Sequence, residues 1–234
     1  MQRKDFLRRL GTFSVAPIVL ACKGDEATPT NATNAGICAT TALETAGPFP
    51  TKNPDNLVMA DIRSDRTGVE LSVKLTIQNK NNGCAPLTGV VVDIWHCDKD
   101  GAYSQYGGTG MQTVNYTAVN FLRGRQTTDL NGQVGFKTIF PGWYSGRATH
   151  IHVHIYTATG TSLLVTQIAF PEGESSAVNQ VNASTANGYT KVMSGYTANA
   201  NDNVFSDGTS TELATLTGSV STGFELLHTI VVSL

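Results

Sequence analysis

The stretch Val69-Glu-Leu-Ser-Val-Lys-Leu-Thr-Ile77 decides the fold class. Its odd-numbered residues are apolar and its even-numbered residues are polar, which is the alternation of a strand with one buried face. Turn residues follow at 80–83, and a second stretch rich in β-branched residues runs over 89–96. Similar patterns predict further strands at 133–140, 151–157, 163–170, 212–221 and 226–234.

Many short strands separated by turns, without a long helical period, predict an all-β protein built as a two-sheet β-sandwich. Only residues 175–194 suggest a short helix, and Asn and Gly weaken that pattern. Three connections are longer than simple turns and are expected to be the active-site loops, because sites usually lie on loops of a rigid scaffold. They are residues 45–66, 101–128 and 171–211.

The chain has 234 residues and a net charge of −2, so no basic surface suggests nucleic-acid binding. Its charged content of 15% is low against a usual ~25%. Thr, Ser, Asn and Gly are abundant instead, which suits a β-rich extracellular protein. Residues 37–234 are expected to fold as one domain, which is long enough to bury a sizeable core.

Residues 1–21 are typical of an export signal, with a basic start and an apolar stretch too short to span a bilayer. The stretch ends in Val19-Leu-Ala-Cys22, which resembles a bacterial lipoprotein signal and predicts lipidation of Cys22 and anchoring in the cell envelope. Arg3-Lys-Asp-Phe-Leu7 resembles a twin-arginine signal with Lys as its second basic residue, so the twin-arginine and Sec routes both stay open. An amphipathic helix of a cytosolic protein is disfavoured, because the pattern stops at Cys22. Residues 22–36 are small and polar and predict a flexible tether.

Three cysteines follow the tether, and export implies an oxidising compartment. Three thiols allow one disulfide and one leftover cysteine. Cys38 and Cys84 each lie in loop-like sequence, which favours them as the pair. Cys97 follows a predicted strand, and we expect it to be a buried free thiol.

A histidine stripe lies on the strand predicted at 151–157, where residues 147–154 read Arg-Ala-Thr-His-Ile-His-Val-His. On a strand, His150, His152 and His154 share one face and the apolar residues between them share the other. Neighbouring histidines are then roughly 6.5–7 Å apart, so two of them can bind one metal ion but all three cannot easily do so. A solvent-facing polar stripe is the alternative.

Two tyrosines stand near this stripe in predicted loops. Tyr144 follows the Pro-Gly turn of 141–142, and Tyr103 follows the glycine turn at Gly101. Phenolate oxygens combined with imidazole nitrogens suit a hard ferric ion. Zinc would more often be bound by cysteines or carboxylates together with the histidines.

Several blocks together resemble the intradiol dioxygenase family, which includes catechol and protocatechuate dioxygenases. The similarity runs in order from about residue 37 to 172 and becomes less clear beyond. A segment at Glu44-Thr-Ala-Gly-Pro-Phe49 is similar to the family's Glu-Gly-Pro-Tyr, with two residues inserted and Phe in place of Tyr. The other blocks are Val92–His96, Gly101–Ser104, Phe121–Gly124, Thr138–Tyr144, Arg147–His152 and Thr166–Phe170.

The resemblance implies a site for Fe(III). The implied ligands are Tyr103, Tyr144, His150 and His152. Tyr144 corresponds to the tyrosine that leaves the iron and acts in catalysis when substrate binds. Arg147 and Gln167 correspond to catalytic residues beside the substrate ring, and Pro48 and Phe49 to the segment that lines the pocket. By contrast, His96 is expected to be structural, Trp95 to belong to the core, and Arg123 to pair with a carboxylate.

The implied function is that of an enzyme, an iron-dependent intradiol dioxygenase that uses O₂ to cleave a catechol-type ring between its two hydroxylated carbons. One alternative is a catalytically inactive β-sandwich module that binds a ligand on the cell envelope. The presence of Arg147 together with all four ligand positions argues against it. A zinc hydrolase built on the histidine pair is a third possibility, which lacks a matching carboxylate nearby.

Overall fold

The computed structural model describes residues 38–183 and 185–234. These described residues form one compact unit. The predicted export signal, tether and lipidated Cys22 lie outside the described residues. Within the described part of the chain, no helix has the length and apolar character to cross a membrane.

The first sheet is built around the strand that the alternating sequence predicts. β1 (Glu70–Asn79) pairs antiparallel with β2 (Ala85–Pro86) and β5 (Gln133–Ile139), and parallel with β9 (Gly223–Val232). β8 (Thr215–Ser219) pairs antiparallel with β9 and forms the far edge. Because one of its pairings is parallel, this sheet is mixed.

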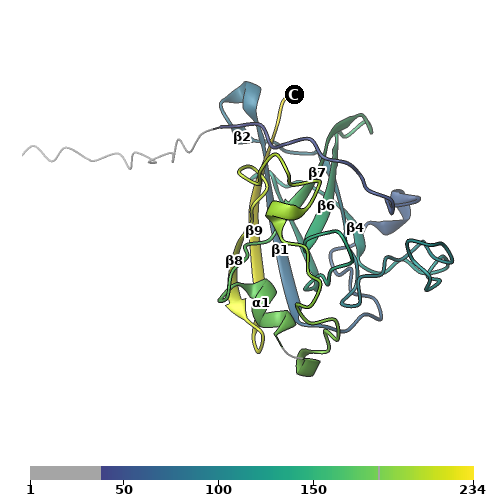
Figure 1. Ribbon diagram of the computed structural model, residues 1–234. Coiled ribbons are helices and arrows are strands. Elements are labelled where there is room, and N and C mark those ends of the chain that lie inside the picture. Colours follow the sequence, from purple (N-terminus) through teal and green to yellow (C-terminus); the bar gives the residue numbers. More distant parts are fainter. Residues whose placement is uncertain (1–37, 184) are drawn as a thin grey trace, which may run out of the picture. The chain divides into compact units, whose positions relative to one another are not determined.

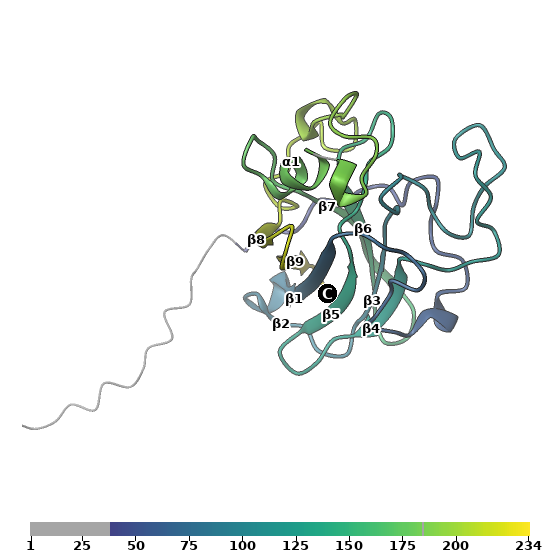
Figure 2. The ribbon, with the colours of Figure 1, turned by 90° about the horizontal axis from the view of Figure 1, so that it is seen from below.

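The second sheet is antiparallel, in the order β4 (Arg123–Thr127), β3 (Val91–Trp95), β6 (His150–Tyr156) and β7 (Ser162–Ala169). The two sheets lie face to face in the domain (Figures 1 and 2). The two-sheet β-sandwich predicted from the sequence is therefore confirmed.

The core lies between the sheets, where the apolar faces of β1 and β6 meet. β1 contributes Leu71, Val73, Leu75 and Ile77. β6 contributes Ile151, Val153 and Ile155, so the apolar residues between the histidines point into the core as the alternation predicts. Each fully buried aliphatic side chain contributes roughly 1.5–3 kcal/mol to folding.

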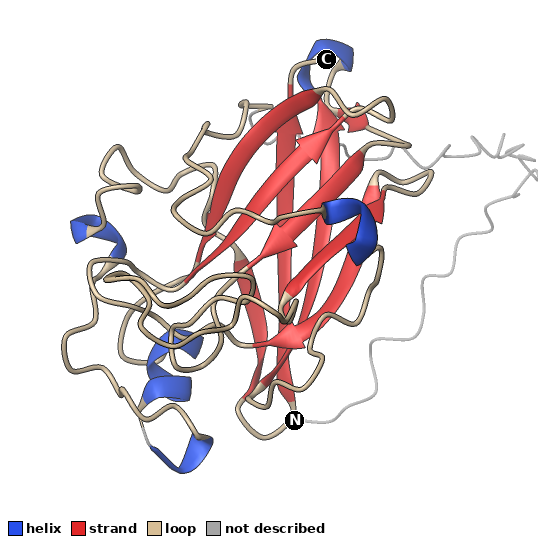
Figure 3. Ribbon diagram, turned by 90° about the vertical axis from the view of Figure 1, so that its right-hand side faces the viewer, coloured by secondary structure: helices blue, strands red, loops and turns tan. Residues whose placement is uncertain are grey.

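Helices are few and short, and Figure 3 shows them among the loops around the strands. The one α-helix described, α1 (Ala177–Asn182), falls in the region where a short helix is predicted, and the Ser176 side chain caps it by accepting from the Asn179 N–H. The 3₁₀ turns are η1 (Pro54–Leu57), η2 (Lys80–Asn82), η3 (Thr185–Asn187) and η4 (Asn199–Asn201).

Two strands lie in segments where the sequence predicts none. β4 falls inside the loop predicted at 101–128, because its sequence Arg-Gly-Arg-Gln-Thr carries no apolar alternation. Pairing with β3 holds it in the sheet, and the Arg125 guanidinium forms two hydrogen bonds with Asp93 across that pair. The two-residue strand β2 is too short to give a sequence pattern.

The open edge of β7 is covered by two segments that are far apart in sequence. The Glu44 N–H donates to the Val165 carbonyl at 2.8 Å, and the Ala169 N–H donates to the Glu212 carbonyl at 3.0 Å. Upstream, the Thr41 N–H donates to the Val231 carbonyl of β9. Residues 41–47 therefore run from one sheet to the other and protect an edge strand from pairing with another chain.

A disulfide bond joins Cys38 and Cys84, the pair favoured from the sequence. Cys84 lies in the turn between β1 and β2, and its N–H donates to the Asn79 carbonyl. The bond closes a loop of sequence separation 46. Cys97 is a buried free thiol.

We expect the double variant Cys38→Ser/Cys84→Ser to lose ~3–4 kcal/mol of unfolding free energy, because the bond restricts the unfolded chain. Equilibrium urea unfolding of the variant and of the wild type measures this. Thiol labelling of the unfolded, unreduced wild type, read peptide by peptide, is the control and should leave Cys38 and Cys84 unlabelled. Equal stability of the two proteins contradicts the prediction.

Glu212 is a fully buried carboxyl group whose two oxygens have no hydrogen-bond partner among the described residues. Burial raises the pKa of Glu212 to about 8, and the carboxylates of Glu44 and Asp207 add to the rise. The folded protein therefore holds this proton more tightly than the unfolded chain does. We expect the contribution of Glu212 to the unfolding free energy to fall as the pH rises from about 4.5 to 8, because ionisation is disfavoured only in the folded state. Buried histidines whose pKa is lowered add a change of opposite sign below about pH 6.5, so this contribution is measured as a difference between the wild type and a Glu212 variant.

Denaturant unfolding between pH 4.5 and 8.5 tests this expectation on three proteins. The unfolding free energy of Glu212→Gln minus that of the wild type should rise over this range, because a neutral amide has no proton to lose and the other titrating groups are common to both proteins. Glu225→Gln removes an exposed carboxylate of β9 and should follow the wild type. If the wild type and Glu212→Gln share one pH profile, the assignment of the fall to Glu212 is wrong.

Candidate metal centre

The four residues predicted as metal ligands come together at one point. His150 and His152 project from the same face of β6, Tyr103 lies in the loop after β3, and Tyr144 lies in the loop between β5 and β6. The Nε2 atoms of the two histidines are 3.2 Å apart, and the Tyr103 hydroxyl is 3.2 Å from His150 Nε2. The Tyr144 ring lies 5.8 Å, between centroids, from both the Tyr103 and the His150 rings.

Both imidazoles are held in the neutral form. Burial lowers the pKa of His150 to about 3, with the Arg147 charge adding to the effect, and burial lowers the pKa of His152 well below its usual value. His150 Nδ1 lies 2.6 Å from the Ala148 carbonyl oxygen, which can only accept, so Nδ1 carries the proton. His150 Nε2 therefore presents a free lone pair toward His152 and Tyr103.

The tyrosines sit in surroundings that oppose their ionisation. Burial raises the pKa of Tyr103 well above its usual value, and burial also raises that of Tyr144. Tyr103 is fully buried, whereas Tyr144 is half-buried at the loop surface. A phenolate at either position would need a cation close by.

This donor set fits a hard metal ion. Two neutral imidazole nitrogens and two phenol oxygens face one another, and a trivalent cation between them would stabilise both phenolates. Among the described residues, no group of three or more His, Cys, Asp or Glu side chains is arranged to hold a metal ion. A metal at this point would therefore need the tyrosines as ligands, which favours ferric iron over zinc.

Aromatic side chains form the walls around the four residues. Trp95 stacks on the His152 ring at 4.9 Å, and Phe49 stacks on the Tyr103 ring at 4.8 Å. Gly47 packs so closely that a Cβ atom there would lie 3.0 Å from His152 Cε1, and its φ of +67° also favours glycine. Pro48 is exposed, so of the two residues predicted to line the pocket, Phe49 is the one that contacts the ligand set.

Arg147 lies beside the ligands and is buried. Its Nη1 is 3.4 Å from His150 Nε2 and 3.5 Å from the Tyr144 hydroxyl. Its Nη2 donates to Gln167 Oε1 at 2.5 Å, and Gln167 Nε2 donates to the Thr45 carbonyl at 2.8 Å. The two residues predicted to lie beside a substrate are thus linked to each other and to the segment that covers β7.

Asp202 also contacts the Arg147 guanidinium, and this contact was not predicted from the sequence. Its carboxylate accepts from Arg147 Nε at 2.9 Å, and Asp202 is fully buried. Asp202 lies in the long connection 171–211, after η4. No strand pattern or recognisable motif surrounds it, so nothing in the sequence points to this role.

The prediction that Arg123 pairs with a carboxylate is wrong. Arg123 is fully buried, and its guanidinium donates to neutral acceptors: Ser104 Oγ, the carbonyls of Ser104 and Phe49, and Thr51 Oγ1. Burial lowers its pKa to about 10. Neutral acceptors suffice because four hydrogen bonds satisfy the guanidinium. Arg123 thereby joins the segment that carries Phe49 to the loop that carries Tyr103.

His96, His154 and Trp95 lie near the ligands without belonging to them. His96 is fully buried and bridges the Thr138 hydroxyl and the Cys97 carbonyl, which is a structural role. His154 is half-buried on the outer side of β6, where its nitrogens contact Ser162 and Tyr156. Trp95 is buried, but it packs against the ligand set rather than in the main core.

Comparisons with known proteins point to one family. The sequence model of the family described as Dioxygenase matches residues 47–209, which extends beyond the resemblance seen in the sequence. A chlorocatechol 1,2-dioxygenase from Rhodococcus opacus is 30% identical over 146 residues, covering 54% of this chain and 52% of that protein. The chain therefore spans about half the length of this relative.

Solved structures of dioxygenases also resemble this chain. An intradiol ring-cleavage dioxygenase from Tetranychus urticae has a TM-score of 0.72 and 29% identity, over 84% of this chain and 95% of that chain. The dioxygenase domain of a carbohydrate-binding fusion from Streptomyces sp. SirexAA-E has a TM-score of 0.60 and 24% identity, over 84% and 99% of the two chains. The second likeness concerns the fold alone.

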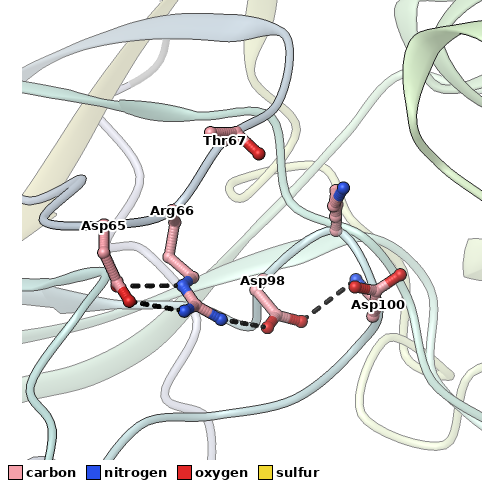
Figure 4. Close-up of a pocket in the computed structure, with 6 residues that line it drawn as sticks. Asp65, Arg66, Thr67, Asp98 and Asp100 are labelled. Atoms are coloured by element: carbon pink, nitrogen blue, oxygen red, sulfur yellow. Dashed lines mark hydrogen bonds and ion pairs between the residues drawn. The ribbon is translucent and has the colours of Figure 1, made fainter.

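Asp98 connects the loops that carry the two tyrosines. Its carboxylate accepts from the Asp100 and Ala102 N–H groups at 3.0 and 2.9 Å and lies 3.5 Å from the Arg66 guanidinium; Figure 4 shows the contacts with Asp100 and Arg66. Its carbonyl accepts from the Gly142 N–H, at a contact so close that a Cβ atom at Gly142 would clash with the backbone of Asp98. Asp98 therefore fixes Tyr103 and Tyr144 relative to each other.

Asp98→Ala should lower the unfolding free energy by about 1–3 kcal/mol, because it leaves buried N–H groups without an acceptor. Urea unfolding measures the loss. Asp100→Ala is the matched control, since Asp100 is exposed and contributes its backbone N–H rather than its carboxylate, and it should stay within about 0.5 kcal/mol of the wild type. Equal effects of the two substitutions would refute the role given to Asp98.

Proposed function

The chain belongs to the intradiol dioxygenase family, and on this premise we propose that it is a ferric, non-haem enzyme that cleaves catechol-type rings. The substrate would be an aromatic ring with two adjacent hydroxyl groups. The ring would open between the two hydroxylated carbons, with both atoms of O₂ entering a diacid product. The observation that carries the proposal is the convergence of two phenols, two neutral imidazoles and one guanidinium on a single point.

The proposed iron ligands are Tyr103, Tyr144, His150 and His152. Ferric iron at this point would supply Lewis-acid chemistry, lowering the pKa of catechol hydroxyls that bind to it. The buried imidazoles offer lone pairs at neutral pH, because burial strongly lowers the pKa of both histidines.

The two tyrosines have different surroundings, which supports different roles for them. Tyr103 is fully buried under Phe49, so it is the ligand that stays in place. Tyr144 is half-buried on a loop, and its hydroxyl lies 3.5 Å from Arg147 Nη1. We assign to Tyr144 the role of leaving the metal and accepting a proton from the substrate.

Arg147 and the aromatic walls would act on the substrate directly. The guanidinium is always protonated, so it is unsuited to binding iron and suited to an anion. At Nη1 it would stabilise negative charge that develops on the ring, an interaction that strengthens in the transition state. Phe49 adds an apolar surface suited to a flat aromatic substrate.

The test measures iron content, colour and steady-state oxygen uptake with a panel of catechols. The wild type should hold near-stoichiometric iron, show a red-to-brown phenolate colour and consume oxygen. Arg147→Ala should keep iron and still change colour when a catechol binds, but turn over ~10²–10³-fold more slowly, by analogy with loss of one oxyanion donor.

Matched variants on β6 separate metal binding from folding. His150→Ala and His152→Ala should lose iron, whereas His154→Ala, on the same strand but outside the site, should keep it. Wild-type protein that holds iron and binds catechols without consuming oxygen would make an inactive ligand-binding module the better description. Protein that stays colourless after ferric reconstitution would contradict the ligand set itself.

A further inference from the structure

Asp202 lies in a long connection, yet its carboxylate is fully buried and both of its oxygens accept hydrogen bonds. Both of its oxygens lie 2.9 Å from Arg147 Nε. Oδ2 also accepts from the Ala148 N–H at 2.8 Å, and Oδ1 from the Val204 N–H at 2.9 Å. The carboxylate thus ties the Arg147 side chain, the backbone leading into β6 and the end of the connection 171–211 to one buried point.

These contacts fix which way the guanidinium faces. Arg147 Nε donates to the Asp202 carboxylate, and Arg147 Nη2 donates to Gln167 Oε1 at 2.5 Å. Nη1 is the nitrogen that remains on the side of the metal ligands, 3.4 Å from His150 Nε2 and 3.5 Å from the Tyr144 hydroxyl. A guanidinium is planar, so holding Nε and Nη2 determines the position of Nη1.

We propose that Asp202 is the positioning residue that aims Arg147 Nη1 at the reaction centre. The inference rests on the proposed function and deepens it. Asp202 is not one of the proposed metal ligands and acts through Arg147. The connection 171–211 therefore supplies an essential part of the site, although it carries none of the predicted ligands.

Two other roles for Asp202 must be separated from positioning. Its negative charge alone would offset the buried Arg147 cation, and its bonds to Ala148 and Val204 would stabilise the loop. Asp207 provides the control for charge, because it lies in the same segment, is exposed and, among the described residues, forms no hydrogen bond or ion pair with Arg147. Asp207→Asn removes an equal charge without removing the directional bonds.

The experiment compares Asp202→Asn, Asp207→Asn, Arg147→Ala and the double variant Asp202→Asn/Arg147→Ala in the full iron-loaded chain. Asp202→Asn should lower kcat about 10²-fold, because a small misplacement of a positioned group costs that much. KM should change little, since the catechol is held mainly by the metal. In the Arg147→Ala background Asp202→Asn should lower kcat no further, because residues that act as a unit are non-additive. Asp207→Asn should retain wild-type kcat.

A second readout needs neither iron nor turnover. Urea unfolding of the iron-free wild type, Asp202→Asn, Arg147→Ala and the double variant should show a coupling between Asp202 and Arg147. Additive effects, in unfolding or in kcat, would overturn the inference, as would an equal loss of kcat in Asp207→Asn. If the wild type consumes no oxygen, the proposed function is wrong. The unfolding cycle then still decides whether Asp202 holds Arg147.

Arg147→Lys covers the case in which Asp202→Asn does not fold. Lysine keeps the charge and can pair with Asp202, but it has no planar fork to aim. Its kcat should fall nearly as far as that of Arg147→Ala. Wild-type turnover in Arg147→Lys would show that aiming is unnecessary and would overturn the inference.

Discussion

Strand β6 is buried on both faces at its beginning, and the rest of the molecule is arranged around that constraint. One face packs Ile151 and Val153 into the core, and the other presents His150 and His152 to the candidate metal centre. Burying two imidazoles requires that both stay neutral and that polar or aromatic neighbours surround them. Trp95 and Tyr103 are such neighbours: Trp95 reaches the histidines from β3, and Tyr103 reaches them from the loop after β3.

The loops around the site are held by a few buried polar side chains as well as by apolar packing. The Asp98 carboxylate holds the turn that leads to Tyr103, Arg123 joins the Phe49 segment to the Tyr103 loop, and Asp202 joins the last long connection to Arg147. Hydrogen bonds are directional, so such side chains fix orientation as well as position. This arrangement suits a site in which the direction of each donor matters more than the strength of any one contact.

The sequence predicts those parts of the fold that depend on local alternation. β1 and β6 carry one apolar face each, so their residues, their inward faces and the convergence of His150 and His152 are readable from period-two patterning. β4 is not readable, because Arg-Gly-Arg-Gln-Thr has no apolar face and its place in the sheet depends on partners distant in sequence. Tyr103, Tyr144 and Arg147 are recognisable through resemblance, whereas Asp202 and Asp98 act through contacts that only the folded chain creates.

The disulfide between Cys38 and Cys84 has a mechanical consequence. Residues 41–49 reach from β9 to the site, where Thr45 accepts from Gln167 and Phe49 covers Tyr103. The covalent bond fixes the start of this segment to the turn between β1 and β2. A pull on the chain upstream of Cys38 is therefore borne by a covalent bond anchored in the first sheet, and the hydrogen bonds that align Gln167 and Arg147 carry none of the load.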